Sequence, residues 1–221
     1  RHAGEQCEPK DRQRDAADLY ESKALMKNKR RHDRREHAVP GGVGGGAASA
    51  VSTIEFISGA GETRAALAAT VFTVLVGSVS FTGSILTFMK LQELMTSRPV
   101  VIPGGKIITP LIAIGAIAAA GVLIASPSNT ALYALLALSL ILGVLFVLPV
   151  GGADVPIVIS LLNAFTGLSV AASGYVLNNV LLIVAGTLVG ASGTLLTQMM
   201  AQAMGRPITN TLFGAFTAKK S

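Results

Sequence analysis

Long apolar segments recur along the chain after residue 40, and they predict its helices. A helix that crosses a hydrocarbon core of about 30 Å needs roughly 20 mostly apolar residues. Five segments of the chain reach this length. A sixth, glycine-rich segment, Gly41–Ser58, carries Glu55 and is predicted as a partial span. We therefore expect an all-α fold, a polytopic transmembrane bundle of five to six helices. The five full-length segments are Ala65–Phe88, Ile107–Ser126, Ala131–Val150, Val155–Leu177 and Val180–Met204.

The first 40 residues have a different composition from the rest of the chain. Residues 1–37 hold 11 of the 18 Lys/Arg and 8 of the 12 Asp/Glu. Such dense, mixed charge is typical of a solvated segment, so we expect residues 1–40 to be a charged, poorly ordered head that binds no nucleic acid. The single cysteine, Cys7, excludes an internal disulfide, and no cleavable signal peptide is visible. The helical domain is predicted over residues 41–207 and a basic tail over residues 208–221.

The basic side chains outside the head predict the orientation of the bundle. Six of these seven residues flank one connection or follow the last predicted helix, the loop at residues 59–64 carries Glu62 against Arg64, and the loops at residues 126–130 and 178–179 carry no charge. Lysine and arginine favour the cytoplasmic side of a membrane. We therefore expect the head, the loop around Arg98, the turn at Asp154 and the C-terminus to face the cytoplasm. The basic residues concerned are Lys90, Arg98, Lys106, Arg206, Lys219 and Lys220.

Small and polar residues recur at steps of three and four on three of the predicted helices, where they line one face of each helix. Small residues let helix backbones approach closely in a membrane, so close packing is the simplest interpretation. Asn163 fits that interpretation less well. Its amide lies roughly 12 Å into a helix at 1.5 Å per residue, and we expect it to find partners inside the bundle, in packing or in a relay with water. The three stripes are Gly77, Ser80, Ser84 and Thr87; Ser160, Asn163, Gly167 and Gly174; and Gly186, Gly190, Gly193 and Thr197.

Asp154 is the only acid between Glu93 and the C-terminus, in a region with four acids and seven bases from Ala38 onward. Ionisable groups near a bilayer are costly and tend to mark ion pathways. Asp154 precedes Pro156 by two residues, which is also the pattern of an ordinary helix start capped by a carboxylate. Capping and proton exchange both remain open, and one side chain can do both.

Several kinds of site are missing from the sequence. It shows no Ser/His/Asp arrangement, no paired carboxylates and no metal-binding Cys/His spacing, since all three histidines lie in the head. The run from Gly42 to Ala47 fits G-x-G-x-x-A, but no strand pattern precedes it, which argues against a dinucleotide site. We therefore expect no catalytic residue, no bound metal and no cofactor-binding residue in this chain itself.

Four sequence segments together resemble one known family. GGADVPIVISLLNAFTGLSVAASGYVLNN (residues 151–179) and GTLVGASGTLLTQMMAQAMGRP (residues 186–207) are similar to the membrane domain of the β subunit of the proton-translocating nicotinamide nucleotide transhydrogenases. GSVSFTGSILTFMKLQ (residues 77–92) and GVGGGAASAV (residues 42–51) resemble earlier helices of the same domain. The resemblance covers about residues 42–207. A GGAD turn, an Asn-bearing helix and a GxxxG helix in this order are more specific than hydrophobicity alone.

The resemblance implies roles for individual residues. In that family, hydride passes between NAD(H) and NADP(H) bound in two soluble domains, coupled to proton movement through the membrane domain. Asp154, Asn163 and Ser84 match residues of the proton pathway. The helix that leads into the NADP(H)-binding domain is matched by Gly186, Gly190, Ser192 and Gly193.

The resemblance leads to one functional hypothesis and leaves one alternative. The chain is expected to be the proton-translocating membrane part of an NAD(P)+ transhydrogenase, with NAD and NADP bound by domains outside it. Its expected partners are the α subunit, the NADP-binding domain and the lipid bilayer, in a dimeric complex. Its expected location is the bacterial cytoplasmic (inner) membrane, with several spans and a cytoplasmic C-terminus. The alternative is a small helical transporter, channel or membrane scaffold without redox coupling.

Overall fold

The structure is a computed structural model that describes residues 22–23, 25–26, 42–59, 63–92, 94–96, 100, 105–151 and 154–205. A first helix covers residues 42–57. No strand occurs within these ranges, so the expected all-α fold is confirmed. Five further helices follow: α2 (Arg64–Leu91), α3 (Gly105–Ala125), α4 (Asn129–Val147), α5 (Val155–Val176) and α6 (Val180–Ala203).

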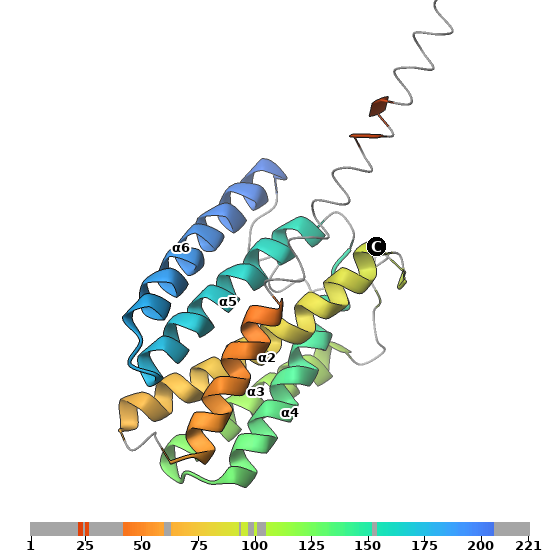
Figure 1. The fold of residues 1–221 in the computed structure, drawn as a ribbon. Helices are drawn as coiled ribbons and strands as arrows, with labels where there is room; N and C mark the ends of the chain where they lie inside the picture. Colours follow the sequence, from red (N-terminus) through yellow and green to blue (C-terminus); the bar gives the residue numbers. More distant parts are fainter. Residues whose placement is uncertain are drawn as a thin grey trace, which may run out of the picture.

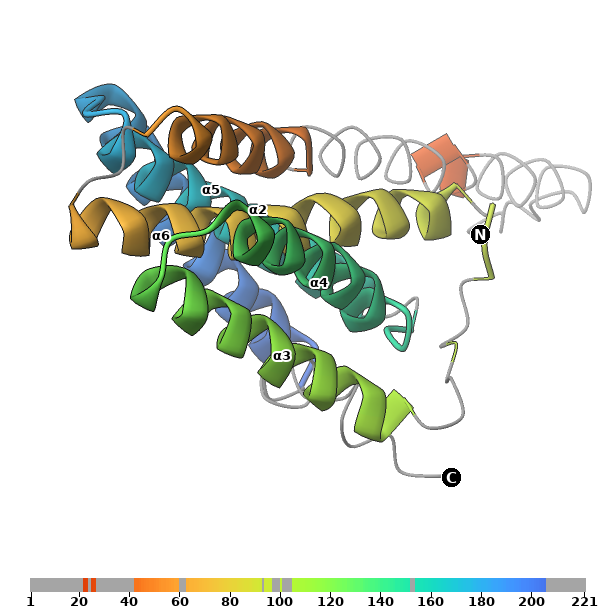
Figure 2. The ribbon, with the colours of Figure 1, turned by 90° about the horizontal axis from the view of Figure 1, so that it is seen from below.

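Consecutive helices alternate in direction (Figure 1). The ends of α2, α4 and α6 and the start of α5 therefore lie at one end of the bundle, which we call the Asp154 end. The turns after the first helix, α3 and α5 lie at the other, which we call the Asn178 end. Seen from below, α6 lies behind the other helices and α3 runs along the opposite side of α4 from α5 (Figure 2).

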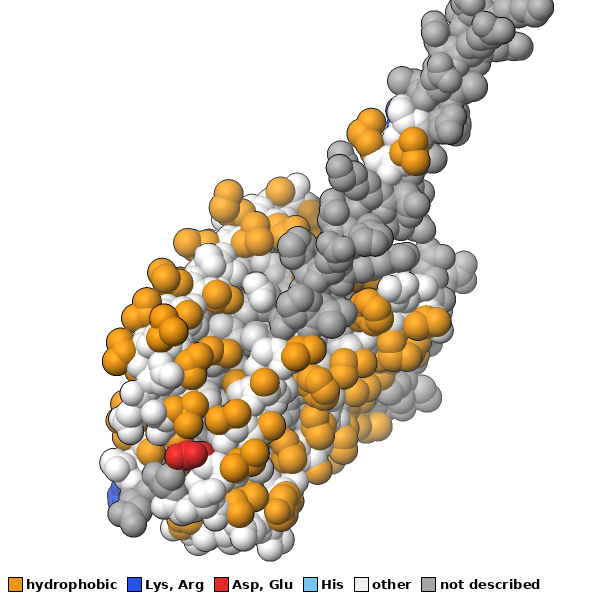
Figure 3. Space-filling model, in the orientation of Figure 1, with side chains coloured by type: hydrophobic (Ala, Val, Ile, Leu, Met, Phe, Trp, Pro, Cys, Tyr) orange, Lys and Arg blue, Asp and Glu red, His pale blue; other side chains and the backbone are white. Residues whose placement is uncertain are grey.

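All five predicted full-length spans are confirmed as helices long and apolar enough to cross a membrane. The predicted partial span is a helix over residues 42–57. The predicted head lies outside the described residues apart from residues 22–23 and 25–26, which are helical, and the tail over residues 208–221 lies outside them entirely. Hydrophobic side chains are spread over the visible face of the helical body, among other side chains and backbone, and charged side chains are few there (Figure 3).

Helices α2 and α5 form the centre of the bundle. In the most apolar 18-residue stretch of each helix, 50% of the residues of α2 and 56% of those of α5 are buried. The corresponding share is 17% for α3 and 22% for α6. One apolar cluster lies toward the Asp154 end and joins Leu86 of α2 to Val147, Val150, Val158 and Leu162. A second cluster joins α2, α3 and α4 through Val74, Leu123, Leu132 and Leu135, all without exposed surface.

The turn between α5 and α6 is built by two asparagines. Asn178 has φ +51°, a left-handed conformation that asparagine adopts more readily than most residues and that ends a helix. The Oδ1 atom of Asn179 then accepts hydrogen bonds from the backbone N–H groups of Leu181 and Leu182, at 3.1 and 3.3 Å. This N-cap starts α6 at once, so α5 and α6 lie antiparallel and side by side.

Candidate functional site

Helices α5 and α6 touch through their backbones. A Cβ atom added to Gly167 would collide with the backbone N of Gly190 and lie 2.9 Å from the carbonyl oxygen of Gly186. One added to Gly186 would meet the backbone N of Ala171 and lie 2.6 Å from the carbonyl oxygen of Gly167. The predicted close packing of these glycines is therefore confirmed, because no side chain fits between the two helices there.

The contact between α2 and α5 depends on hydroxyl groups. Ser80, with no exposed surface, donates a hydrogen bond to the carbonyl oxygen of Leu162 at 2.8 Å, and its Oγ lies 2.6 Å from Oγ1 of Thr166. Further along, the Thr73 hydroxyl lies 3.3 Å from the carbonyl oxygen of Ser169. These directional contacts hold the two helices in one register.

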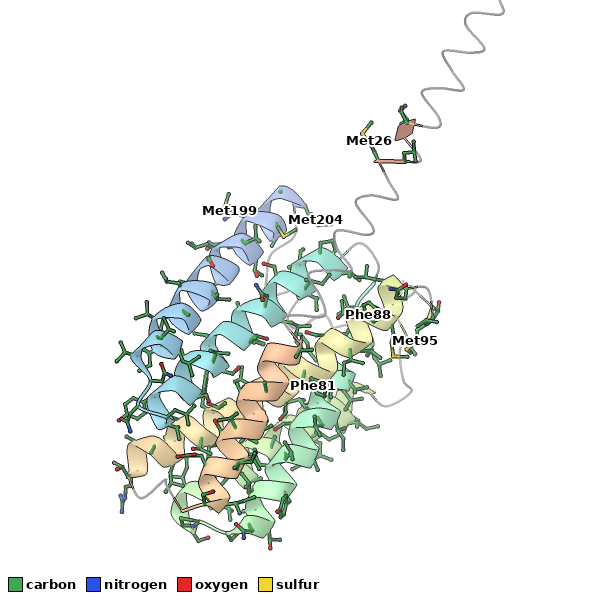
Figure 4. The ribbon with its side chains drawn as sticks, viewed as in Figure 1. Met26, Phe81, Phe88, Met95, Met199 and Met204 are labelled. Atoms are coloured by element: carbon green, nitrogen blue, oxygen red, sulfur yellow. The ribbon has the colours of Figure 1, made fainter. Side chains whose placement is uncertain are left out.

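The first helix packs against α2 in a way that explains its glycines. A Cβ on Gly77 would lie 2.6 Å from the carbonyl oxygen of Gly45. Gly46 faces the ring of Phe81, where the first helix crosses α2 (Figure 4). The hydroxyls of Ser49 and Ser78 are 2.9 Å apart across the same interface. The glycine run that nominally fitted a dinucleotide motif is therefore a helix–helix contact surface.

Asp154 lies at the start of α5 and is partly exposed. Its backbone carbonyl accepts hydrogen bonds from the N–H groups of Ile157 and Val158, both at 3.1 Å. Its side chain makes no capping hydrogen bond, and its φ and ψ of −91° and −8° are not those of an ordinary N-cap. The capping interpretation of Asp154 is therefore wrong in this structure.

Asn163 lies on the exposed side of α5. The expectation that its amide is buried within this bundle is wrong for the described helices. The helical period explains the outcome: Leu162 and Thr166 face α2, Ala164 and Gly167 face α6, and Asn163 points between the two directions. The amide thus borders the bundle surface beside the contact of α5 with α6.

Ser84 and Ser192 occupy contrasting places. Ser84 on α2 is 5% exposed, and a Cβ on Gly42 of the first helix would lie 2.7 Å from its Cβ. Ser192 is exposed on α6, and its hydroxyl bonds the carbonyl oxygen of Val189 within the same helix at 3.2 Å. Among the residues matched to the coupling helix, the three glycines face α5 and Ser192 does not.

A polar contact between α5 and α6 lies toward the Asp154 end. The Thr197 hydroxyl, with one proton to donate, lies within hydrogen-bond distance of two acceptors, the Ser160 hydroxyl at 3.0 Å and the carbonyl oxygen of Gly193 at 2.7 Å. The Ser160 hydroxyl also lies 3.1 Å from that carbonyl oxygen. The small-residue stripes predicted from the sequence include Ser160 and Thr197, but the sequence did not predict a hydrogen bond between these two residues.

Lys90 is a functional candidate that the sequence did not reveal. It was expected to be one of the loop charges, yet it is 2% exposed in the last turn of α2. Its ammonium donates to the carbonyl oxygens of Val147, Leu148 and Val150, at 2.9, 2.6 and 3.1 Å. Backbone carbonyls carry no sequence signal, so such a site cannot be recognised before the helices are assembled.

Comparisons with known proteins agree on one family. A family model described as NAD(P) transhydrogenase beta subunit matches residues 37–221. NAD(P) transhydrogenase subunit beta of Rhodospirillum rubrum is 40% identical over 141 residues, which make up 64% of this chain and 30% of that protein. The same subunit from a designated strain of that species matches to the same extent. The chain thus spans less than a third of the length of these curated relatives.

Proposed function

Because the chain belongs to the NAD(P) transhydrogenase beta subunit family, we propose that it is the membrane part through which protons move in a proton-translocating transhydrogenase. Hydride transfer between NAD(H) and NADP(H) then takes place in nucleotide-binding domains, in a complex with an α subunit. The proposed pathway contains Asp154, Asn163 and Ser84. The alternative of a transporter or scaffold without redox coupling is an outcome of the experiment below.

The observation that carries the proposal is the position of Asp154. It is a partly exposed carboxylate at the start of a membrane-spanning helix, and its side chain is not used to cap that helix. The exposed amide of Asn163 lies on the same helix, nine residues or about 13 Å further along. A polar amide on the exposed side of such a helix is costly in lipid, so we infer that water or a partner helix covers it.

We further propose that the Asp154 end faces the cytoplasm of a bacterial inner membrane. In the sequence, the basic residues that favour this side lie near the end of α2, near the start of α3 or after α6, and these helix termini lie at that end, whereas Arg64 lies at the other end. A reporter fused after Ser221 is expected in the cytoplasm and one inserted at Asn178 outside. Opposite labelling would refute this orientation.

The proposed pathway is tested by neutralising Asp154 in the complete enzyme. Asp154→Asn keeps the size of the side chain but cannot release a proton. We expect normal insertion and assembly, with proton pumping lowered by about 100-fold or more, the size typical of losing a proton-transfer group. The matched control is Glu55→Gln, which neutralises the other carboxylate in the described part of the chain and is expected to pump normally.

A second variant tests the amide. Asn163→Leu suits a lipid-facing or packed position and, because the side chain is exposed, is expected to leave the stability of this chain within about 0.5 kcal/mol of the parent. Coupled turnover is nevertheless expected to fall. If both Asp154→Asn and Asn163→Leu pump like the parent, the proton-pathway proposal is wrong and a scaffold role is favoured.

A further inference from the structure

Lys90 makes an unusual set of contacts for a buried lysine. A lysine ammonium has three N–H donors and no acceptor. In this structure all three donors point at backbone carbonyl oxygens, those of Val147, Leu148 and Val150. Burying a charge is costly unless it is well compensated, so these three bonds are what make the position tolerable.

The three carbonyls lie where the bundle is electrostatically negative. Val147 and Leu148 are the last residue and the C-cap of α4, and the final carbonyls of a helix have no partner within the helix. Helices α2 and α4 run in the same direction, so their C-terminal ends lie together at the Asp154 end (Figure 1). Each end carries about half a negative charge, which the Lys90 ammonium compensates.

Separate backbone hydrogen bonds lie near these carbonyls and at Asp154. Val147 also accepts from the N–H of Val150 at 3.1 Å, and Gly151 accepts from the N–H of Asp154 at 2.9 Å. The apolar cluster that contains Val147 and Val150 includes Val155 and Val158 at the start of α5. The ammonium therefore holds one side of a short turn whose other side carries Asp154.

We propose that Lys90 is a positioning residue for Asp154: it ties the ends of α2 and α4 to the turn that begins α5, and so holds the carboxylate at its place on the bundle. Lys90 does not itself exchange the proton. The consequence for proton pumping rests on the proposed function, whereas the positional claim does not.

The positional claim is tested by hydrogen–deuterium exchange of the complete protein in detergent. Lys90→Met removes all three donors, and Lys90→Gln keeps two donors without the charge. The control is Thr82→Val, which removes another α2–α4 bond, from Thr82 to the carbonyl oxygen of Leu140 at 3.0 Å, away from the turn. The amides to follow are those of Asp154, Ile157 and Val158, which are hydrogen-bonded in the turn and the first turn of α5.

Lys90→Met is expected to speed exchange of these amides by at least about tenfold, since a single hydrogen bond to a charged group is worth that much. Lys90→Gln is expected to stay within about threefold of the parent, because two of the three carbonyls keep a donor. Thr82→Val is expected to leave them unchanged. Unchanged exchange in Lys90→Met, or an equal increase in every helix, would overturn the proposal. If Lys90→Met does not fold, the folded Lys90→Gln variant, which has lost one donor and the charge, decides: a rise of up to about threefold confined to these amides supports the proposal, and no rise at all overturns it.

A double-mutant cycle in the complete enzyme tests whether Lys90 acts through Asp154. Lys90→Met is expected to slow coupled turnover by about tenfold in the parent and by less than about twofold in the Asp154→Asn background, since coupled residues are not additive. Equal effects in both backgrounds would overturn the role of Asp154 in the inference. If Asp154→Asn turns over like the parent, Asp154 has no part in the proposed pathway and the exchange data alone decide on Lys90.

Discussion

Helix α5 makes two contacts of opposite character. Toward α6 it presents Gly167 and Gly174, and the backbones themselves are in contact. Toward α2 it presents Thr166 and the carbonyl oxygen of Leu162, which are joined to Ser80 by hydrogen bonds. The first contact depends on the absence of side-chain atoms and the second on directional bonds.

The difference predicts different mechanical behaviour. Where two helix backbones pack through glycines, no hydrogen bond fixes the position of one helix along the other. The hydroxyl hydrogen bonds between α2 and α5, in contrast, can form at one relative position of the two helices only. Among the described residues, side-chain hydrogen bonds between α5 and α6 are made at the Asp154 end, through Ser160 and Thr197. We infer that α2 and α5 form the fixed part of the bundle and that α6 can shift against α5 at lower cost.

The largest expected effect is on the glycine contact. Gly186→Leu places a side chain where even a Cβ atom meets the backbone of Ala171, so the helices must separate. We expect a loss of about 3 kcal/mol of stability, measured by unfolding in mixed detergent and SDS micelles. Ala185→Leu, on the exposed side of the same helix, is the control and is expected to change stability little. Equal stability of the two variants would show that the backbones do not touch.

The hydroxyl contact is expected to respond less. Ser80→Ala leaves the packing intact but removes the bonds to Leu162 and Thr166, at an expected cost of about 1 kcal/mol. The same unfolding measurement applies. Ser192→Ala is the matched control, because that exposed hydroxyl bonds only within α6. A Ser80→Ala variant as stable as the control would remove the basis for calling α2 and α5 the fixed part.

The smallest expected effect sharpens the comparison within α6. Thr197→Val keeps the side-chain shape but removes the bond to Ser160, at an expected cost of about 0.5 kcal/mol. Spin labels on α5 and α6 near the Asp154 end should show a broader distance distribution. Thr194→Val is the control, since the Thr194 hydroxyl donates to Gly190 within α6. If both variants broaden the distribution equally, the polar contact does not hold this end of α6.

Part of the candidate site could be recognised in the sequence. The stripe of Gly186, Gly190 and Gly193 was visible from its spacing and packs as predicted, because a helix of known period places such residues on one face. Asn163 was placed on the stripe of Ser160 and Gly167 by the same rule, but it lies at the edge of that face and is exposed. The helical period predicts the direction of a side chain to within about a quarter turn, and the packing of the neighbouring helices decides whether that side chain is buried.

The sequence by itself determined five full-length helices, their approximate bounds and the faces with small residues, because length and apolar composition act on each segment separately. Only the tertiary structure decided that Lys90 is buried on three carbonyl oxygens, that Asp154 does not cap α5, and that α6 meets only the glycine side of α5. These features depend on backbone atoms that every residue carries alike. Their positions exist only after separate helices have packed together, so no residue pattern along the chain can encode them directly.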